Sequence, residues 1–154
     1  MEIITKDLVR KAVDLVIPAV EKILNTPKLI WGPKWVEGII DAPGTALTFT
    51  IGEKTKWDPE WGEEISFAEI AAKKLEVIRR EGVNSSQVVA NKPWKLEKGE
   101  FLYPGGATRD GIFVAVSGAR GRVDEAIAEM IISVIVMLAF MEADGRLKEG
   151  KDQI

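Results

Sequence analysis

Two residue types that support much of protein chemistry, cysteine and histidine, are absent from this sequence. Without cysteine the chain has no disulfide framework, no thiolate nucleophile and no zinc-finger ligands. Without histidine it lacks the usual general base near neutral pH and the commonest metal ligand. Few nucleophiles and general bases are left, and this weakens an enzymatic interpretation.

The sequence also lacks a long hydrophobic run and a strong charge of either sign. Its longest nearly apolar stretch is residues 130–141, whereas a membrane span needs about 20 residues. Charged residues interrupt the N-terminal apolar positions, so no signal peptide is expected (Lys6, Asp7, Arg10 and Lys11). The net charge of −3 disfavours a nucleic-acid binder. We therefore expect a cytoplasmic protein with neither a membrane nor a nucleic acid as a partner.

The length of 154 residues suits one domain, which is expected to span residues 1–154 with a polar tail from about residue 144. Thr5 is a suitable N-cap for a helix that runs to about Leu24, with an apolar stripe at three- and four-residue steps. Pro18 lies inside this pattern and is expected to kink or divide the helix.

Turn and cap signals define the next elements. The turn signal Pro43-Gly44 separates two runs rich in β-branched and aromatic residues, which predict a hairpin with strands at residues 35–42 and 45–51. Ser66 with Glu69 forms a capping box, which marks the start of a helix. Gly82 is the C-terminal stop of the same helix. Asn84 and Ser85 are expected to cap a short helical turn through Ala90.

The segment around which the rest is organised is residues 101–129. It predicts a Gly-Gly turn at Gly105 and Gly106, a buried strand from Ile112 to Val116, and a helix over residues 123–143. That helix contains a β-branched run that would also suit a strand, but its acidic start and its Leu, Ala and Met continuation favour a helix. Because it is apolar nearly all round, it must be covered on more than one side. Such a helix either lies deep in the fold or forms a subunit contact, and we predict that it contributes to a homodimer or higher homo-oligomer.

Several motifs together are typical of one family. They are Gly105-Gly106, Asp110-Gly111, a strand ending Ala115-Val116-Ser117-Gly118, and an acidic helix start at Asp124-Glu125. Upstream, Ile39-Ile40-Asp41 with Pro43-Gly44 and the Ala71-Ala72-Lys73-Lys74 run fit the same pattern. In this order the sequence resembles the GlcG/HbpS-like domains, over roughly residues 5–143.

The resemblance implies an α+β fold of the profilin-like kind. That fold is a three-layer α/β/α sandwich with a mainly antiparallel sheet of about five strands. It also implies a small-molecule ligand, with haem or a corrinoid as cofactor candidates. Haem is disfavoured by the absence of histidine, through which haem-binding members partly hold the group; Tyr103 and the methionines are the remaining candidate ligands for iron. Thr108, after Ala107, stands where the family commonly has a proline.

Two segments are candidate parts of a ligand site. Residues 117–122 join a strand to a helix, where exposed amides and two guanidinium groups could hold a carboxylate or phosphate; a plain connecting turn is the favoured alternative. Residues 105–109 offer amides and a cation beside Tyr103, either as one wall of a pocket or as a turn that requires positive φ. The candidate ligand-binding residues are Tyr103, Gly105, Gly106, Ala107, Thr108, Arg109, Ser117, Gly118, Arg120 and Arg122.

Other candidates have simpler structural explanations. Asp41 and Asp110 could serve as catalytic carboxylates or cation ligands, but an aspartate beside a turn more often caps backbone amides. Four tryptophans could line an aromatic site or an interface, but a minor core under long loops is the commoner arrangement (Trp31, Trp35, Trp57 and Trp61). No metal site and no catalytic residue is predicted.

Three functional interpretations remain open. The first is a small-molecule-binding module for an anionic or planar ligand. The second is a cofactor-assisted enzyme that uses carboxylates or Tyr103, and the third is a structural oligomerisation domain.

Overall fold

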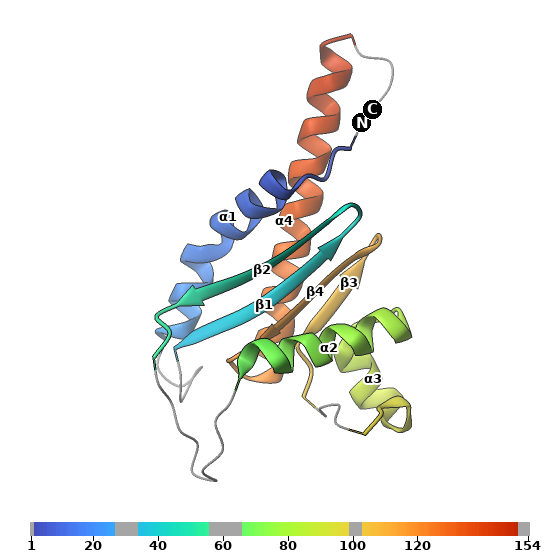
Figure 1. The fold of residues 1–154 in the computed structure, drawn as a ribbon. Coiled ribbons are helices and arrows are strands. Elements are labelled where there is room, and N and C mark those ends of the chain that lie inside the picture. Colours follow the sequence, from blue (N-terminus) through green and yellow to red (C-terminus); the bar gives the residue numbers. More distant parts are fainter. Residues whose placement is uncertain (1, 27–33, 56–65, 99–102, 151–154) are drawn as a thin grey trace.

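A computed structural model describes residues 2–26, 34–55, 66–98 and 103–150. Within these residues the chain forms one antiparallel sheet with the strand order β2-β1-β4-β3. The strands are β1 (Trp35–Ala42), β2 (Thr45–Gly52), β3 (Gly106–Arg109) and β4 (Ile112–Ser117). The two inner strands come from distant parts of the sequence and lie side by side (Figure 1).

Two tight turns set the strand register. Pro43 and Gly44 join β1 to β2, with Ala42 opposite Thr45. Asp110 and Gly111 join β3 to β4, and both have positive φ, 54° and 78°. Positive φ at both central residues is the signature of a type I′ turn, for which Asp-Gly is a preferred pair. The second hairpin is therefore specified by a local signal.

Helices cover both faces of the sheet (Figure 1). On one face lie α1 (Lys6–Leu24) and α4 (Gly121–Lys148), which pack on each other and on the strands. Alternate residues of the inner strands, among them Val36, Ile40 and Val114, point into this larger core. The Thr5 hydroxyl accepts a hydrogen bond from the backbone N–H of Leu8, as an N-cap does. Pro18 lies within α1, which is not divided there.

The other face is covered by α2 (Phe67–Glu81), with α3 (Ser85–Asn91) and the short η1 (Pro93–Lys95) following it. Ala71, Leu75 and Ile78 form a smaller core with Ala115 of β4. The predicted caps are confirmed: the Ser66 hydroxyl accepts from the N–H of Glu69, and Gly82 ends α2 in a left-handed conformation.

The α+β class and the buried strand after Gly111 are confirmed, but three predictions differ from the structure. The described residues contain four strands, where about five were predicted. Gly105 and Gly106 are not a turn, because Gly106 begins β3 opposite Ala115 and neither glycine has positive φ. Glycine is needed there for close approach instead, since a Cβ on Gly105 would lie 2.6 Å from the carbonyl oxygen of Val116.

The third difference concerns α4, which continues to Lys148, beyond the predicted end near residue 143. Two ion pairs at i,i+4 spacing, Glu142–Arg146 and Asp144–Lys148, support the additional turns. By length and composition alone α4 could cross a membrane. One side of this helix nevertheless packs on the sheet and α1, and core helices of soluble proteins meet the same length and composition criterion.

Candidate functional site

The two segments proposed as ligand-binding lie next to each other. The Gly105 carbonyl accepts a 2.8 Å hydrogen bond from the N–H of Val116, just before Ser117. Pro104 packs on Gly121 so closely that a Cβ on that glycine would lie 2.7 Å from the proline ring. The start of β3 and the loop that leads into α4 therefore form one junction.

Beneath this junction Lys74 of α2 and Asp124 of α4 form a buried ion pair. Lys74 Nζ lies 3.4 Å from Asp124 Oδ2, and the two side chains are 5% and 2% exposed. The ammonium group also donates to the carbonyl of Val116 at 3.1 Å. The second carboxylate oxygen accepts from the N–H of Ala119 at 2.9 Å. The pair thus connects the helix on one face of the sheet to the helix on the other.

Burial sets the protonation behaviour of both groups. Loss of hydration lowers the pKa of Lys74, and the nearby Asp124 carboxylate only partly offsets this effect. Loss of hydration also raises the pKa of Asp124 to about 6, against the opposing influence of Lys74 and of the backbone N–H groups of Ala119 and Gly118. Opposite shifts of this kind, at a junction of elements, are a feature of functional sites and also of structural ion pairs.

The raised pKa of Asp124 predicts a pH dependence of stability. Because its pKa rises from 3.8 to about 6 on folding, the folded protein holds this proton more tightly than the unfolded chain does. The contribution of Asp124 to the free energy of unfolding is therefore full below about pH 4 and is lost as the pH rises through 6. Urea denaturation at several pH values should show the wild type losing stability relative to Asp124→Asn across this window. A difference that stays constant with pH would contradict the assignment.

A second buried group, the Ser85 hydroxyl at the start of α3, holds the double glycine. It accepts hydrogen bonds from the N–H groups of Gly105 and Gly106 at 2.7 and 2.8 Å. Its single hydrogen can be donated to the Gly106 carbonyl at 3.2 Å or to Glu125 Oε1 at 3.3 Å. The same Glu125 oxygen accepts from the N–H of Ser86 at 2.7 Å. The amides that the sequence offered to an anion are thus bonded within the protein.

Asn84 extends this network to the next strand residue. Its side-chain oxygen accepts from the N–H of Thr108 at 2.9 Å, and its Nδ2 donates to Glu129 of α4 at 2.9 Å. The predicted short helix is confirmed, but Asn84 does not cap it through its side chain. Asn84 instead fastens the start of α3 to β3 and α4.

The remaining predicted site residues divide into buried and exposed positions. Ala107 and Ser117 are buried in strands. Gly118 has φ +135°, and a Cβ at this position would lie 2.4 Å from the Trp35 carbonyl oxygen, so close backbone approach requires a glycine here. Arg109 is exposed at the end of β3, where it donates to Ser133 of α4 at 3.3 Å.

Three side chains at the junction reach solvent. Tyr103 is 70% exposed, and it precedes the proline that packs on Gly121. Arg120 and Arg122, on either side of that glycine, are both exposed. Arg122 lies 3.5 Å from Glu125, with its own side chain 77% exposed. A phenol and two guanidinium groups are therefore carried by exposed residues next to Pro104 and Gly121 in the sequence.

The other candidates have structural partners. Asp41 pairs with Arg79 of α2, and Asp110 occupies the hairpin turn. Trp35 is buried against Phe67, with ring centroids 5.0 Å apart, which confirms the prediction of a core role for this tryptophan. Trp31, Trp57 and Trp61 lie outside the described residues.

Sequence reasoning missed Lys74, Ser85 and Glu125 as members of a network, and it assigned Asp124 only to the helix start. Lys74 entered sequence reasoning only as part of the Ala71–Lys74 run that fits the family pattern. Its spacing was the available signal, because it lies three residues after Ala71 and four before Ile78, on the buried stripe. Ser85 had no such signal, since its partners are 20 to 40 positions away.

The comparisons with known proteins add no assignment. No family model matches the chain, and no curated protein sequence is significantly similar to it. Among the described residues no group of three or more acidic side chains could hold a metal ion. The geometry of the junction is therefore the basis for any functional conclusion.

Proposed function

We propose that this chain is a small-molecule-binding module of the GlcG/HbpS-like type, with a profilin-like fold and an anionic or planar ligand. The order of motifs along the chain supports the family. The observed contact between residues 103–109 and 117–122 supports the site, because the family likeness places a ligand cleft near the double glycine. A cytoplasmic location remains a prediction from the sequence.

The observation on which this proposal rests is the contact between Pro104 and Gly121, whose sequence neighbours Tyr103, Arg120 and Arg122 are exposed. Arg120 and Arg122 can bind a carboxylate or phosphate, and guanidinium groups do so with paired hydrogen bonds. Tyr103 can stack on a planar ligand. Beneath them the double glycine and the start of α4 are held by Ser85, Glu125 and the Lys74–Asp124 pair. The exposed groups therefore stand on a rigid base, which favours binding because little ordering is required.

The same geometry gives less support to catalysis. Lys74 and Asp124 have the most perturbed pKa values among the described residues, but their side chains are almost completely buried. A general acid or base must come within hydrogen-bond distance of its substrate. In this conformation neither group can do so, and binding is the function that the junction supports better.

The first test is native mass spectrometry with an absorbance spectrum of gently purified protein, followed by titration with haem, cobalamin and nucleoside phosphates. We expect one anionic or planar compound to be retained or to bind. Replacing Arg120 and Arg122 by alanine should weaken that binding at least about tenfold, since a hydrogen bond to a charged group contributes about 1.5–3 kcal/mol.

The matched control is Arg10→Ala with Lys11→Ala, which removes two exposed cations from α1. This variant has the same net charge as the arginine variant and should bind like the wild type. Equal weakening in both variants would indicate a general charge effect. If nothing is retained and no compound binds, the proposed function is wrong.

A further inference from the structure

One side of α4 is exposed along a regular stripe. Its residues follow the four- and three-residue steps of a heptad repeat, and all are exposed except the partly buried Met130: Met130, Ser133, Met137, Phe140, Asp144 and Leu147. We call these six residues the α4 seam. They lie opposite the buried side of the same helix, which carries Ile131, Ile135 and Leu138. A 3.5-residue apolar repeat is the pattern by which one helix packs along another.

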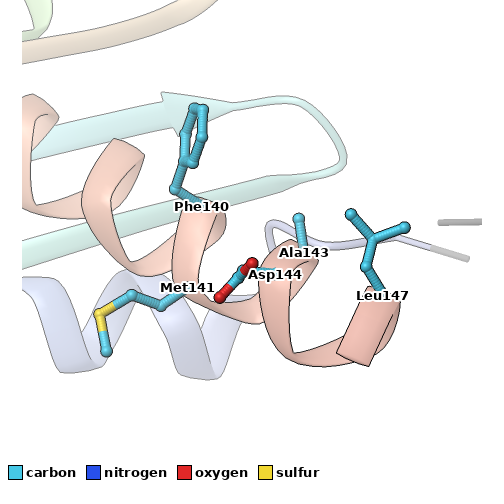
Figure 2. A pocket seen from close by; sticks show the side chains of 5 residues that line it. All are labelled: Phe140, Met141, Ala143, Asp144 and Leu147. Carbon is cyan, nitrogen blue, oxygen red and sulfur yellow. The ribbon is translucent and has the colours of Figure 1, made fainter. Parts of the chain in front are cut away.

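The end of the seam extends beyond the domain. Leu138 is the last buried residue of α4, and the helix continues to Lys148 (Figure 1). Phe140 is 76% exposed, and Met137 and Leu147 are about half exposed. Figure 2 shows Phe140, Ala143 and Leu147 projecting from one side of this segment. With Met141 and Asp144 they line an open hollow of about 300 Å³. Large apolar side chains grouped at a surface commonly mark an interaction site.

We propose that two copies of this chain pair through the α4 seam, antiparallel and related by a two-fold axis that passes between Leu138 and Ala139. In a two-fold contact, residues at equal distances on either side of the axis face each other. Phe140 then faces Met137 of the second copy, and Leu147 faces Met130 of the second copy. The hollow lies opposite Met130 and Ser133 of the second copy.

The polar residues of the seam select this register. With the axis in this place, Asp144 faces Ser133 of the second copy, which is bonded to Arg109 in its own chain. The carboxylate can then pair with that exposed guanidinium, while its other oxygen keeps the 2.8 Å ion pair with Lys148. A shift of half a heptad toward the C-terminus would place Asp144 against Phe140, and a parallel pair would place two Asp144 carboxylates together. Unlike these two alternatives, the proposed arrangement separates polar from apolar layers and matches opposite charges.

A lipid surface is the competing occupant, because α4 is long and apolar enough to meet the criterion for a membrane span. The seam contains Asp144, however, and the helix ends in a cluster of charges at Glu142, Arg146 and Lys148. These groups suit a partner of complementary charge better than a hydrocarbon phase. A second copy supplies that charge through Arg109.

Sedimentation velocity of the full chain between about 5 and 100 µM tests the proposal. We expect a species of twice the 17.0 kDa chain mass. Phe140→Glu should be monomeric over this range, because it places a charge in an apolar layer on each side of the axis. Leu15→Glu, a change at a residue of α1 outside the seam that is 51% exposed, is the matched control and should remain dimeric. Circular dichroism should show that both variants are folded.

A charge exchange tests the register. Asp144→Arg alone should weaken dimerisation at least about tenfold, because it places two guanidinium groups together. Adding Arg109→Asp should restore the dimer, since the pair is then reversed. A wild type that stays monomeric at 100 µM, dimers of Phe140→Glu, or no recovery in the double variant would each overturn the proposal. Monomeric binding to phosphatidylcholine–phosphatidylglycerol vesicles would also overturn it and would assign the seam to a membrane surface.

Discussion

Replacing Lys74 by methionine should lower the free energy of unfolding by about 3–5 kcal/mol, because it leaves the Asp124 carboxylate buried without its cation. Lys74 is 5% exposed and also donates to the Val116 carbonyl. Methionine keeps much of the length and apolar volume of the side chain, so the loss reports the charge and its hydrogen bonds. Urea denaturation at pH 7 measures the change as a lower transition midpoint.

A double-mutant cycle separates the pair from its surroundings. Asp124→Asn keeps an oxygen that can accept from Ala119 but removes the charge. Because each single change leaves one buried charge unpaired, the double variant should be more stable than the sum of the two single effects predicts. Lys73→Met is the matched control, since Lys73 is 49% exposed and forms only a surface pair with Glu76. Its effect should be within about 1 kcal/mol. Additive effects of Lys74→Met and Asp124→Asn would show that the pair is not coupled.

Local signals were sufficient for most of the fold. Thr5, Ser66 and Gly82 mark helix ends through hydrogen bonds and backbone conformations that involve residues within a few positions. Pro43-Gly44 sets the first hairpin in the same way. Such signals depend only on neighbours in the sequence, and this is why the bounds of α1, β1 and α2 could be predicted closely.

β3 was missed because it has four residues and begins with a glycine, which is uncommon in strands. Its turn signal, Asp110-Gly111, was present, but it was interpreted only as part of a family motif. The double glycine was assigned to a turn for its conformational freedom. Glycine is needed at both positions because Lys74, Ile78 and Val116 leave no room for a Cβ there. That reason depends on packing between distant segments.

The candidate site was predictable as a pair of adjacent segments but not as a network. The sequence named residues 103–109 and 117–122 as candidate parts of one site, and the close approach of Pro104 to Gly121 shows that the two segments meet. The sequence could not show that Ser85 and Asp124 already accept hydrogen bonds from backbone N–H groups of these segments, those of Gly105 and Ala119. A small hydroxyl can bind any backbone amide that the fold brings near, so spacing along the chain carries no information about its partner. The proposal assigns the ligand to the exposed side chains of Tyr103, Arg120 and Arg122.

Replacing Ser85 by alanine should lower the free energy of unfolding by about 2–4 kcal/mol. The hydroxyl is the acceptor for the buried N–H groups of Gly105 and Gly106, and each buried donor left without a partner costs about 1–3 kcal/mol. Alanine is slightly smaller than serine and has a good helix propensity, so neither overpacking nor loss of helix accounts for such a change. The measurement is urea denaturation combined with amide hydrogen exchange.

Hydrogen exchange distinguishes this effect from general destabilisation. Exchange at Gly105 and Gly106 should accelerate more than exchange in β1, because the double glycine loses its anchor while the inner strand keeps its pairing with β4. Ser86→Ala is the matched control, since its backbone N–H still donates to Glu125. Its effect should stay below about 1 kcal/mol. Uniform acceleration over the whole sheet would mean that Ser85 stabilises the fold without holding the double glycine. In that case the rigid base assigned to Tyr103, Arg120 and Arg122 would lose one of its supports.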